Sequence, residues 1–273
     1  MSLEVCVRSM TYEPVYSGVR SPALRSFLRL PPIRHRSQVI QDFELTIERG
    51  EVVAIIGASG AGKTTLLRIL AGVETSYDGY VKLDGDQVTK PNRRVYLMPQ
   101  EHTLLPWRNV ERNLAFNFRN GTEESRLATP DRLLGMFKLS DKRYQYPHSL
   151  SGGERARVAL MCAMCAMPEI LLLDEPFRGL DQLTMERCQD DLVRWLGETK
   201  AQESVVLVSH SIADAVFLAD RVVVVGSRPL RPFAEFVMPN QRIRRSEEST
   251  SLEERVLDAL VKVQTGNGNG TGC

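Results

Sequence analysis

Eight consecutive residues have the composition of a loop that binds phosphate. Gly57-Ala58-Ser59-Gly60-Ala61-Gly62-Lys63-Thr64 matches the pattern G-x-x-x-x-G-K-[ST] and lies between an apolar run and a helical pattern. Glycines let successive backbone N–H groups surround a β-phosphate, and the helix N-terminus adds positive charge. We expect Lys63 to reach the β- and γ-phosphates, the Thr64 hydroxyl to bind Mg²⁺ and Thr65 to contact the α-phosphate. The segment therefore predicts a binding site for a nucleotide.

A second segment ends in two adjacent acids. Ile170–Leu173 is an apolar run typical of a buried strand, and Asp174 and Glu175 follow it directly. Burial of the strand would fix Asp174 at its carboxyl end as a ligand of Mg²⁺. Glu175 would point elsewhere and could orient the attacking water or take its proton. An acidic pair in this place could also cap the next helix, but the phosphate loop upstream favours the catalytic interpretation.

A glycine-rich pentapeptide, Leu150-Ser151-Gly152-Gly153-Glu154, lies between these two segments. With them it resembles the nucleotide-binding subunits of ATP-binding cassette (ABC) transporters, over about residues 3–228. It is similar to the family signature LSGGQ, with Glu154 as a tolerated variant of the last residue. In that family the signature comes from the opposite subunit and contacts the γ-phosphate through its serine and glycine amides. The resemblance implies that Ser151, Gly152 and Gly153 complete the site of a partner chain.

The resemblance assigns roles to four further positions. Gln100 matches the glutamine that contacts Mg²⁺ and the water and signals to the membrane subunits. Gly179-Leu180-Asp181 resembles the loop that links the two sites of the dimer. His210 matches the histidine that contacts the γ-phosphate, although a lone histidine after a strand is usually structural. For the aromatic residue that stacks on adenine, Tyr12 is the first candidate and Tyr16 the second.

Within the family, one branch fits best. The segment from Gln100 to Trp107 and the run Asp214–Arg221 are similar to importers of nitrate, sulfonate, taurine and related anions. The resemblance implies an ATP hydrolase that forms a homodimer with ATP and works with transmembrane permease subunits and a solute-binding protein. It would lie in the cytoplasm, on the inner face of the membrane, and would not act on nucleic acid. Departures from the branch are the run Asn92–Arg94, the pair Arg178-Gly179 and an insert at residues 14–37.

Two alternatives remain open. One is an ABC exporter or an envelope-maintenance cassette. The other is a cassette outside transport, which acts in DNA repair or on ribosomes. Relatives of the second kind carry long coiled coils or two cassettes in one chain, and neither feature is present in these 273 residues.

Alternating strand and helix patterns must hold these residues in place. They predict an α/β P-loop cassette with a mostly parallel core sheet, an antiparallel β subdomain and a helical subdomain inserted at about 101–150. The ATPase domain would cover 1–228, and 229–273 would form a strand and helix extension. The predicted strands are Leu3–Ser9, Val39–Ile47, Val52–Ile56, Tyr80–Leu83, Val95–Met98, Ile170–Leu173, Val205–Ser209 and Arg221–Val225, and the main helices are Lys63–Ala71, Gln182–Thr199 and Ile212–Leu218.

Two stretches stand apart from this pattern. Residues 14–37 carry several arginines and no acid, and they form either a solvated loop, a contact with the membrane subunit or a contact with anionic lipid headgroups. Near the end, Ser251-x-x-Glu254 predicts a capping box that opens a helix through about Val263. A disordered Gly/Asn-rich tail is expected from about residue 265.

The composition of the chain restricts its possible functions less than the motifs do. The 35 basic and 34 acidic residues leave a net charge of +1, which gives no general attraction to nucleic acid. No run approaches the roughly 18 apolar residues of a spanning helix, and we expect a soluble chain. The five cysteines lack the spacing of a disulfide framework. Cys162 and Cys165 are expected to pack in a helix.

Overall fold

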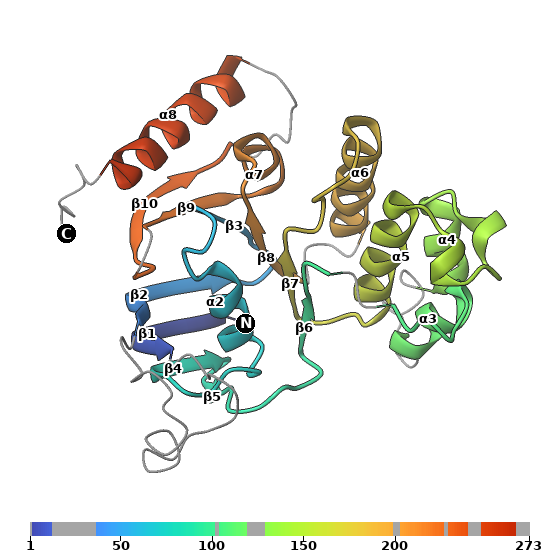
Figure 1. The fold of residues 1–273 in the computed structure, drawn as a ribbon, viewed down its shortest axis with the longest axis horizontal. Coiled ribbons are helices and arrows are strands. Elements are labelled where there is room, and N and C mark those ends of the chain that lie inside the picture. Colours follow the sequence, from blue (N-terminus) through green and yellow to red (C-terminus); the bar gives the residue numbers. More distant parts are fainter. Residues whose placement is uncertain are drawn as a thin grey trace, which may run out of the picture.

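The computed structural model describes residues 2–12, 37–101, 104–118, 129–198, 203–226, 229–239 and 247–265. Two β-sheets form the body of the molecule, and a group of helices stands to one side of it (Figure 1). The arginine-rich residues 14–37, the basic insert, lie outside the described residues except for Ser37, and so does the tail after Thr265. The three interpretations of the insert stay predictions.

The smaller sheet is antiparallel and has the strand order β2-β1-β4-β5. Alternate residues of its long strands are buried, as in Leu3, Val5 and Val7, because an antiparallel sheet covers one face and leaves the other to solvent. The pairing of β1 with β2 shifts register between Met10 and Thr11. The strands are β1 Ser2–Tyr12, β2 Ser37–Glu48, β4 Asp78–Leu83 and β5 Asp86–Gln87.

The larger sheet has the order β10-β9-β3-β8-β7-β6. Four neighbouring pairs are parallel and only β10 runs antiparallel to β9. Strands β3, β7 and β8 are buried along their whole length, which explains their continuous apolar sequences. The predicted α/β cassette fold is confirmed. The strands are β3 Val52–Ile56, β6 Val95–Met98, β7 Ile170–Asp174, β8 Ser204–Ser209, β9 Arg221–Val225 and β10 Pro232–Val237.

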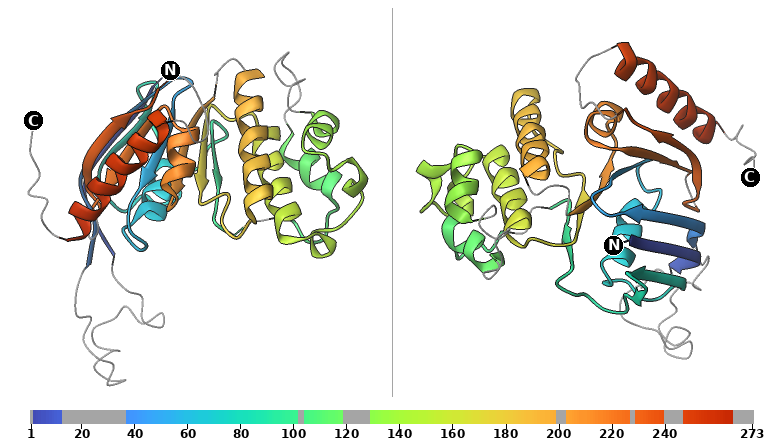
Figure 2. Two further views of the ribbon diagram at one scale, coloured as in Figure 1. Left: turned by 90° about the horizontal axis from the view of Figure 1, so that it is seen from above. Right: turned by 180° about the vertical axis from the view of Figure 1, so that it is seen from behind.

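Helices cover both faces of the larger sheet. Helix α2 lies between the two sheets, whereas α5, α6 and α7 pack on the opposite face (Figure 2). Helices α3 and α4 pack against α5 at the far end from the antiparallel sheet (Figure 1). The helices are α2 Lys63–Leu70, α3 Val110–Asn117, α4 Pro130–Met136, α5 Gly152–Cys165, α6 Gln182–Glu198, α7 Ile212–Leu218 and α8 Glu247–Gln264, with short 3₁₀ turns at Ser140–Lys142 and Pro147–Ser149.

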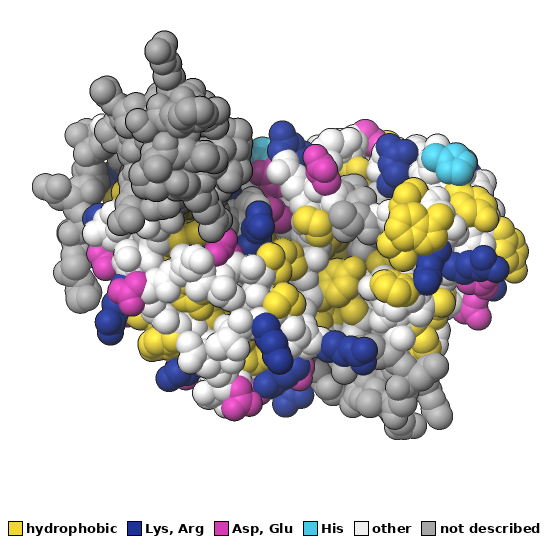
Figure 3. Space-filling view, turned by 60° about the horizontal axis from the view of Figure 1, so that its bottom comes forward, with side chains coloured by type: hydrophobic (Ala, Val, Ile, Leu, Met, Phe, Trp, Pro, Cys, Tyr) yellow, Lys and Arg dark blue, Asp and Glu magenta, His cyan; other side chains and the backbone are white. Residues whose placement is uncertain are grey.

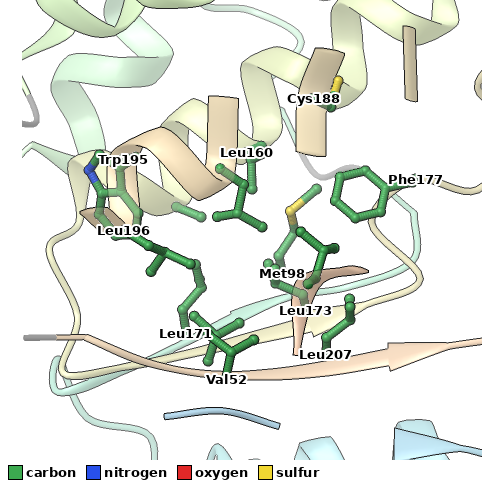
Figure 4. Packing of buried hydrophobic residues seen from close by; sticks show 14 of the residues in the cluster. Val52, Met98, Leu160, Leu171, Leu173, Phe177, Cys188, Trp195, Leu196 and Leu207 are labelled. Carbon is green, nitrogen blue, oxygen red and sulfur yellow. The ribbon is translucent and has the colours of Figure 1, made fainter. Parts of the chain in front are cut away.

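Each central strand contributes to two hydrophobic cores. In β7, Ile170 and Leu172 face α2 and the antiparallel sheet, while Leu171 and Leu173 face α5 and α6. Figure 4 shows the second of these cores, with Trp195 and Leu160 above Leu171 and Val52. Successive side chains of a strand point to opposite faces, so burial on both sides fixes the strand from above and below. The carboxyl ends of the strands are therefore firmly placed.

The C-terminal helix differs from its prediction. Helix α8 begins at Glu247, so Ser251 and Glu254 lie inside it and do not open it. The helix packs on α7, β9 and β10, and Arg255 stacks over Phe236 with its guanidinium carbon 5.4 Å from the ring centre.

Two expectations from composition can be compared with the structure. No helix in the described ranges is long and apolar enough to cross a bilayer. Cys162 and Cys165 are both buried in α5. Burial raises the pKa of the Cys162 thiol to about 12, so this thiol stays protonated and behaves as an apolar side chain.

Candidate active site

The loop between β3 and α2 has a backbone that only glycine adopts easily. Gly60 and Gly62 have positive φ angles of 73° and 108°, in the left-handed region. At Gly62 a Cβ atom would also lie 2.9 Å from a methyl carbon of Val39, so a side chain would collide with β2. Gly62 is the residue that caps the start of α2. Glycine at these positions therefore lets the chain turn from β3 into the start of α2.

Lys63 is held close to its own loop. The ammonium donates hydrogen bonds to the carbonyl oxygens of Gly57 at 2.7 Å and Ala58 at 2.9 Å, and the residue is only 6% exposed. Burial lowers its pKa, while the nearby carboxylates Glu175 and Asp174 act in the opposite direction. The result is a buried cation with acidic neighbours, which is suited to an anionic ligand.

Asp174 lies at the last position of β7 and is also buried. Its carboxylate accepts a hydrogen bond from the Thr64 hydroxyl, which joins the end of β7 to the start of α2. Burial raises the pKa of Asp174, and the negative charge of Glu175 acts in the same direction. Thr64 and Asp174 are thus close enough to bind one metal ion together.

Glu175 has a left-handed backbone conformation, and several side chains surround its carboxylate. Its φ angle of 49° is in the left-handed region, and its N–H donates to the carbonyl oxygen of Val208 at 3.0 Å. Strain of this kind is typical of functional sites. Three side chains approach the same oxygen, Oε2: Gln100 Nε2 at 3.3 Å, Arg178 at 3.1 Å and His210 Nδ1 at 3.8 Å.

Eight of the sixteen predicted site residues line one cavity of about 530 Å³. Its wall combines the glycine loop and α2 with residues that follow strands β6 and β7, because the carboxyl ends of parallel strands meet at one edge of a sheet. The predicted residues in this wall are Ser59, Gly60, Gly62, Lys63, Thr64, Thr65, Gln100 and Glu175, and the others are Gln38, Val39, Arg178 and Val208.

His210 lies in an adjoining cavity of about 210 Å³, which shares Glu175 and Arg178 with the first. It follows β8, and its side chain is 61% exposed. This position, beside Glu175 and open to solvent, is compatible with contact to a ligand in the larger cavity.

Gly57 has a packing role. A Cβ atom on this residue would lie 2.6 Å from a methyl carbon of Val225, so β9 leaves no space for a side chain. Its backbone still contributes to the site, because its carbonyl oxygen accepts a hydrogen bond from Lys63.

Besides Gly57, Asp174 and His210, four described residues from the predicted site are not in the wall of the large cavity. Within the described ranges, Ser151, Gly152, Gly153 and Asp181 line neither of the two cavities. Asp181 caps the start of α6, where its carboxylate accepts from the Thr184 N–H at 3.0 Å and the Thr184 hydroxyl at 2.7 Å. These hydrogen bonds lower the pKa of Asp181. Tyr12 ends β1, but its side chain and all of Tyr16 lie outside the described residues, so the adenine contact stays a prediction.

The glycine-rich pentapeptide forms the N-terminus of α5. Ser151 Oγ accepts from the Glu154 N–H at 3.2 Å, and Glu154 Oε2 accepts from the Ser151 N–H at 2.8 Å. This reciprocal pair is a capping box. It lowers the pKa of Glu154, chiefly through the bond from the Ser151 backbone. Ser151 is exposed at this helix start, and so is Gly152, where backbone N–H groups attract anions.

Two features of the site were not predicted from the sequence. The capping box could have been found, because Ser151-x-x-Glu154 has the same spacing as the pattern proposed at Ser251. Arg178 was noticed only as a departure from the importer branch. Its contact with Glu175 depends on the turn between them, in which the Arg178 N–H donates to the Glu175 carbonyl oxygen at 3.1 Å.

Comparison with known proteins identifies the relatives of this chain. The family model described as ABC transporter matches residues 40–178. An aliphatic sulfonates import ATP-binding protein of Xanthomonas axonopodis pv. citri is 41% identical over 223 residues, which cover 80% of this chain and 88% of that protein. A nitrate import ATP-binding protein of Synechocystis is 37% identical over 193 residues, which cover 70% of this chain and 71% of that protein.

Solved structures have the same fold. A dimeric ATP-binding cassette in a post-hydrolysis state, bound to ADP and phosphate, superimposes with a TM-score of 0.68 at 23% identity, covering 88% of this chain and 100% of that one. A dimeric bacterial ABC transporter cassette gives a TM-score of 0.66 at 24% identity, with the same coverage. From the family match, the relatives and the geometry of the site together, this chain belongs to the ABC transporter family as one of its ATPase subunits.

Proposed function

We propose that the cavity of about 530 Å³ is the ATP site and that its residues act as the sequence predicts. One observation carries this proposal: Lys63, Thr64, Gln100 and Glu175 come from three separate segments and line the same cavity. The glycine loop and the start of α2 would hold the α- and β-phosphates. Lys63 would then exchange its contacts with its own loop for contacts with the β- and γ-phosphates.

Mg²⁺ fits the residues that are present. Thr64, Gln100 and Asp174 offer oxygen atoms, which are the ligands that Mg²⁺ prefers. Thr64 contacts Asp174 directly and lines the same cavity as Gln100. The described residues contain no group of three His, Cys, Asp or Glu side chains placed to hold a metal, but Mg²⁺ commonly takes only one or two protein carboxylates together with substrate phosphates. The ion would neutralise charge on the phosphates.

Hydrolysis requires attack of water on the γ-phosphate. Glu175 would orient that water through its carboxylate, and His210 would contact the γ-phosphate. Lys63 would stabilise the charge that develops on the phosphate oxygens. These roles rest on the positions of the side chains around Glu175 Oε2, where the three contacts converge.

The second half of each site would come from another copy of the chain. The N-terminus of α5 is a ready anion site, yet Ser151, Gly152 and Gly153 do not line the cavity of their own chain among the described residues. A homodimer with ATP between the loop of one copy and the α5 N-terminus of the other would complete two sites. Two structures with the same fold are described as dimers.

For the transport system, we propose import of a small anion such as a sulfonate or nitrate, which relatives of this chain are named for. The chain would act at the cytoplasmic face of the membrane, on separate permease subunits that receive the solute from a binding protein. A surface on the helical side suits a permease: Trp107, Phe116, Tyr144 and Tyr146 are 70%, 62%, 68% and 40% exposed. We call these four residues the aromatic surface.

Replacement of Glu175 tests the mechanism. Glu175→Gln should still bind ATP but should lose turnover, because an amide cannot take a proton from the water, and the protein should accumulate as a dimer with ATP. Phosphate release and light scattering after size-exclusion chromatography measure the two effects. Glu254→Gln, which changes an exposed acid of α8, is the matched control and should behave as the unchanged protein. A monomer that keeps hydrolysing ATP would contradict the mechanism.

A further inference from the structure

Arg178 is a cation at the mouth of the ATP site that the roles above do not use. A short turn from Glu175 brings it back over the Glu175 carboxylate, and the two form an ion pair at 3.1 Å. Its side chain is 58% exposed, whereas that of Glu175 is 14% exposed. Arg178 also lines both cavities. The guanidinium can therefore reach a ligand in the larger cavity while its backbone stays in place.

The pair between Arg178 and Glu175 is easy to break. Ion pairs of solvent-exposed arginines contribute little to stability, because water stabilises the separated charge nearly as well. Glu175 Oε2 would also keep Gln100 and His210 as neighbours if Arg178 left. A planar guanidinium binds a phosphate through two parallel hydrogen bonds, and a terminal phosphate carries more negative charge than a carboxylate.

We propose that Arg178 exchanges partners in each cycle: it holds the Glu175 carboxylate first and then binds the γ-phosphate of ATP. The exchange has two consequences. It frees Glu175 to orient the water only when a γ-phosphate is present, and it adds binding strength for ATP that ADP does not receive. Arg178 is thus a residue that distinguishes the two nucleotides. This inference rests on the proposal that the cavity holds ATP.

Binding of two nucleotides provides the first test. Calorimetry with ADP and with a non-hydrolysable ATP analogue, both with Mg²⁺, gives two dissociation constants for each variant. Arg178→Ala should weaken binding of the ATP analogue about tenfold, the loss expected for one charge-assisted hydrogen-bonded contact. Binding of ADP should change less than about twofold. Arg178→Lys should recover part of the loss, since lysine keeps the positive charge but lacks the planar guanidinium that makes two parallel hydrogen bonds.

Arg194→Ala is the matched control. Arg194 is 56% exposed and forms the same i,i+3 pair with Asp191, at 3.6 Å, on helix α6 away from both cavities. This variant should change neither dissociation constant. Thermal unfolding of both alanine variants checks that each is folded, which the exposure of the two side chains favours.

A double-mutant cycle with Glu175→Gln separates exchange from simple positioning. In the Glu175→Gln variant Arg178 has no ion pair to break before it binds the γ-phosphate. Arg178→Ala should therefore weaken binding of the ATP analogue more in the Glu175→Gln background than in the unchanged chain. If Arg178 only positioned Glu175, its replacement would have no effect on affinity in that background, and the proposal would be overturned.

The remaining outcomes are also decisive. Equal losses for ADP and the ATP analogue, or no loss for either, would overturn the proposal while leaving the ATP site intact. Failure of the unchanged chain to bind both nucleotides would instead reject the ATP site on which the proposal rests.

Discussion

At the scale of single residues, the site is built from charges that are costly to bury. Lys63 is 6% exposed and Asp174 is 3% exposed. Burial lowers the pKa of Lys63 and raises the pKa of Asp174, so in both cases the environment disfavours the charged form. In the proposed function, phosphate and metal need these charges, so function would oppose stability at these two positions.

Asp174→Asn should therefore stabilise the protein in the absence of nucleotide and metal. The raised pKa means that the ionised carboxylate reduces folding stability fully at neutral pH, and this loss diminishes as the pH falls through the raised pKa. We expect a melting temperature about 2–4 °C higher at pH 7, as for a gain near 1 kcal/mol, and a smaller gain at low pH. Hydrolysis with Mg²⁺ should be lost.

Calorimetry in the presence of a chelator measures this effect. Asp258→Asn is the control, because Asp258 is a 64% exposed acid paired with Lys262 on α8. It should change the melting temperature little. A lower melting temperature for Asp174→Asn at pH 7 would show that lost contacts with Thr64 and Lys63 outweigh the relief of burial.

At the scale of elements, the capping box and the proposed anion contact lie at the same helix end, the N-terminus of α5. The capping box stabilises the first turn of α5, and Gly152 in the same turn is exposed. Lys142 lies 3.4 Å from Glu154 Oε1 and adds a second contact to the acid. Glu154 therefore stabilises the start of the helix, and a capping box can have either glutamate or glutamine at this position.

Ser151→Ala and Glu154→Gln should differ in stability. Ser151→Ala removes the acceptor for the Glu154 N–H and should cost about 1 kcal/mol, the usual loss of an N-cap. Glu154→Gln keeps an acceptor and loses only the charge, so it should change unfolding by less than about 0.5 kcal/mol. Urea unfolding measures both, and ATP hydrolysis should fall only for Ser151→Ala. Equal destabilisation by the two variants would reject this role of the capping box.

At the scale of the whole molecule, the nucleotide site and the aromatic surface are on different parts of the chain. The segments that carry the aromatic surface lie together, because Val110 and Glu111 donate backbone hydrogen bonds to Gln145 and Arg143 at 2.9 and 3.0 Å. Hydrophobic side chains and Lys or Arg side chains gather at the helical end of the face in Figure 3. Arg108 lies over Phe116, with its guanidinium carbon 4.7 Å from the ring centre. Exposed aromatic and arginine side chains are the residues most often decisive in protein interfaces.

Trp107→Ala should weaken the complex with the membrane subunits of the same transport system. A loss of at least tenfold in affinity is expected for a central aromatic residue, which is about 1.4 kcal/mol or more. Hydrolysis by the isolated chain should not change. Val237→Ser, at a 78% exposed position on β10, is the control and should bind normally. Equal binding by both variants, measured by co-purification from membranes, would place the permease contact elsewhere.

The sequence by itself determined the chemistry and the fold class. The glycine loop, the acids after β7 and the signature are local patterns, and each needs only its neighbouring strand or helix to be recognised. Alternating strand and helix patterns were enough to predict the α/β cassette. A strand buried on one face alternates apolar and polar residues, and a strand buried on both faces is apolar throughout. Element ends were predicted less well, as at α8, where the helix begins at Glu247, four positions before the expected cap at Ser251.

Only the tertiary structure decided which of these residues meet. Gln100 and Glu175 are 75 positions apart, and they touch because β6 and β7 are neighbours in the parallel sheet. His210 joins them from β8 for the same reason. The contact between Arg178 and Glu175 depends on one turn and on a left-handed residue. Strand order and backbone conformation result from packing over the whole chain, so no local pattern contains them.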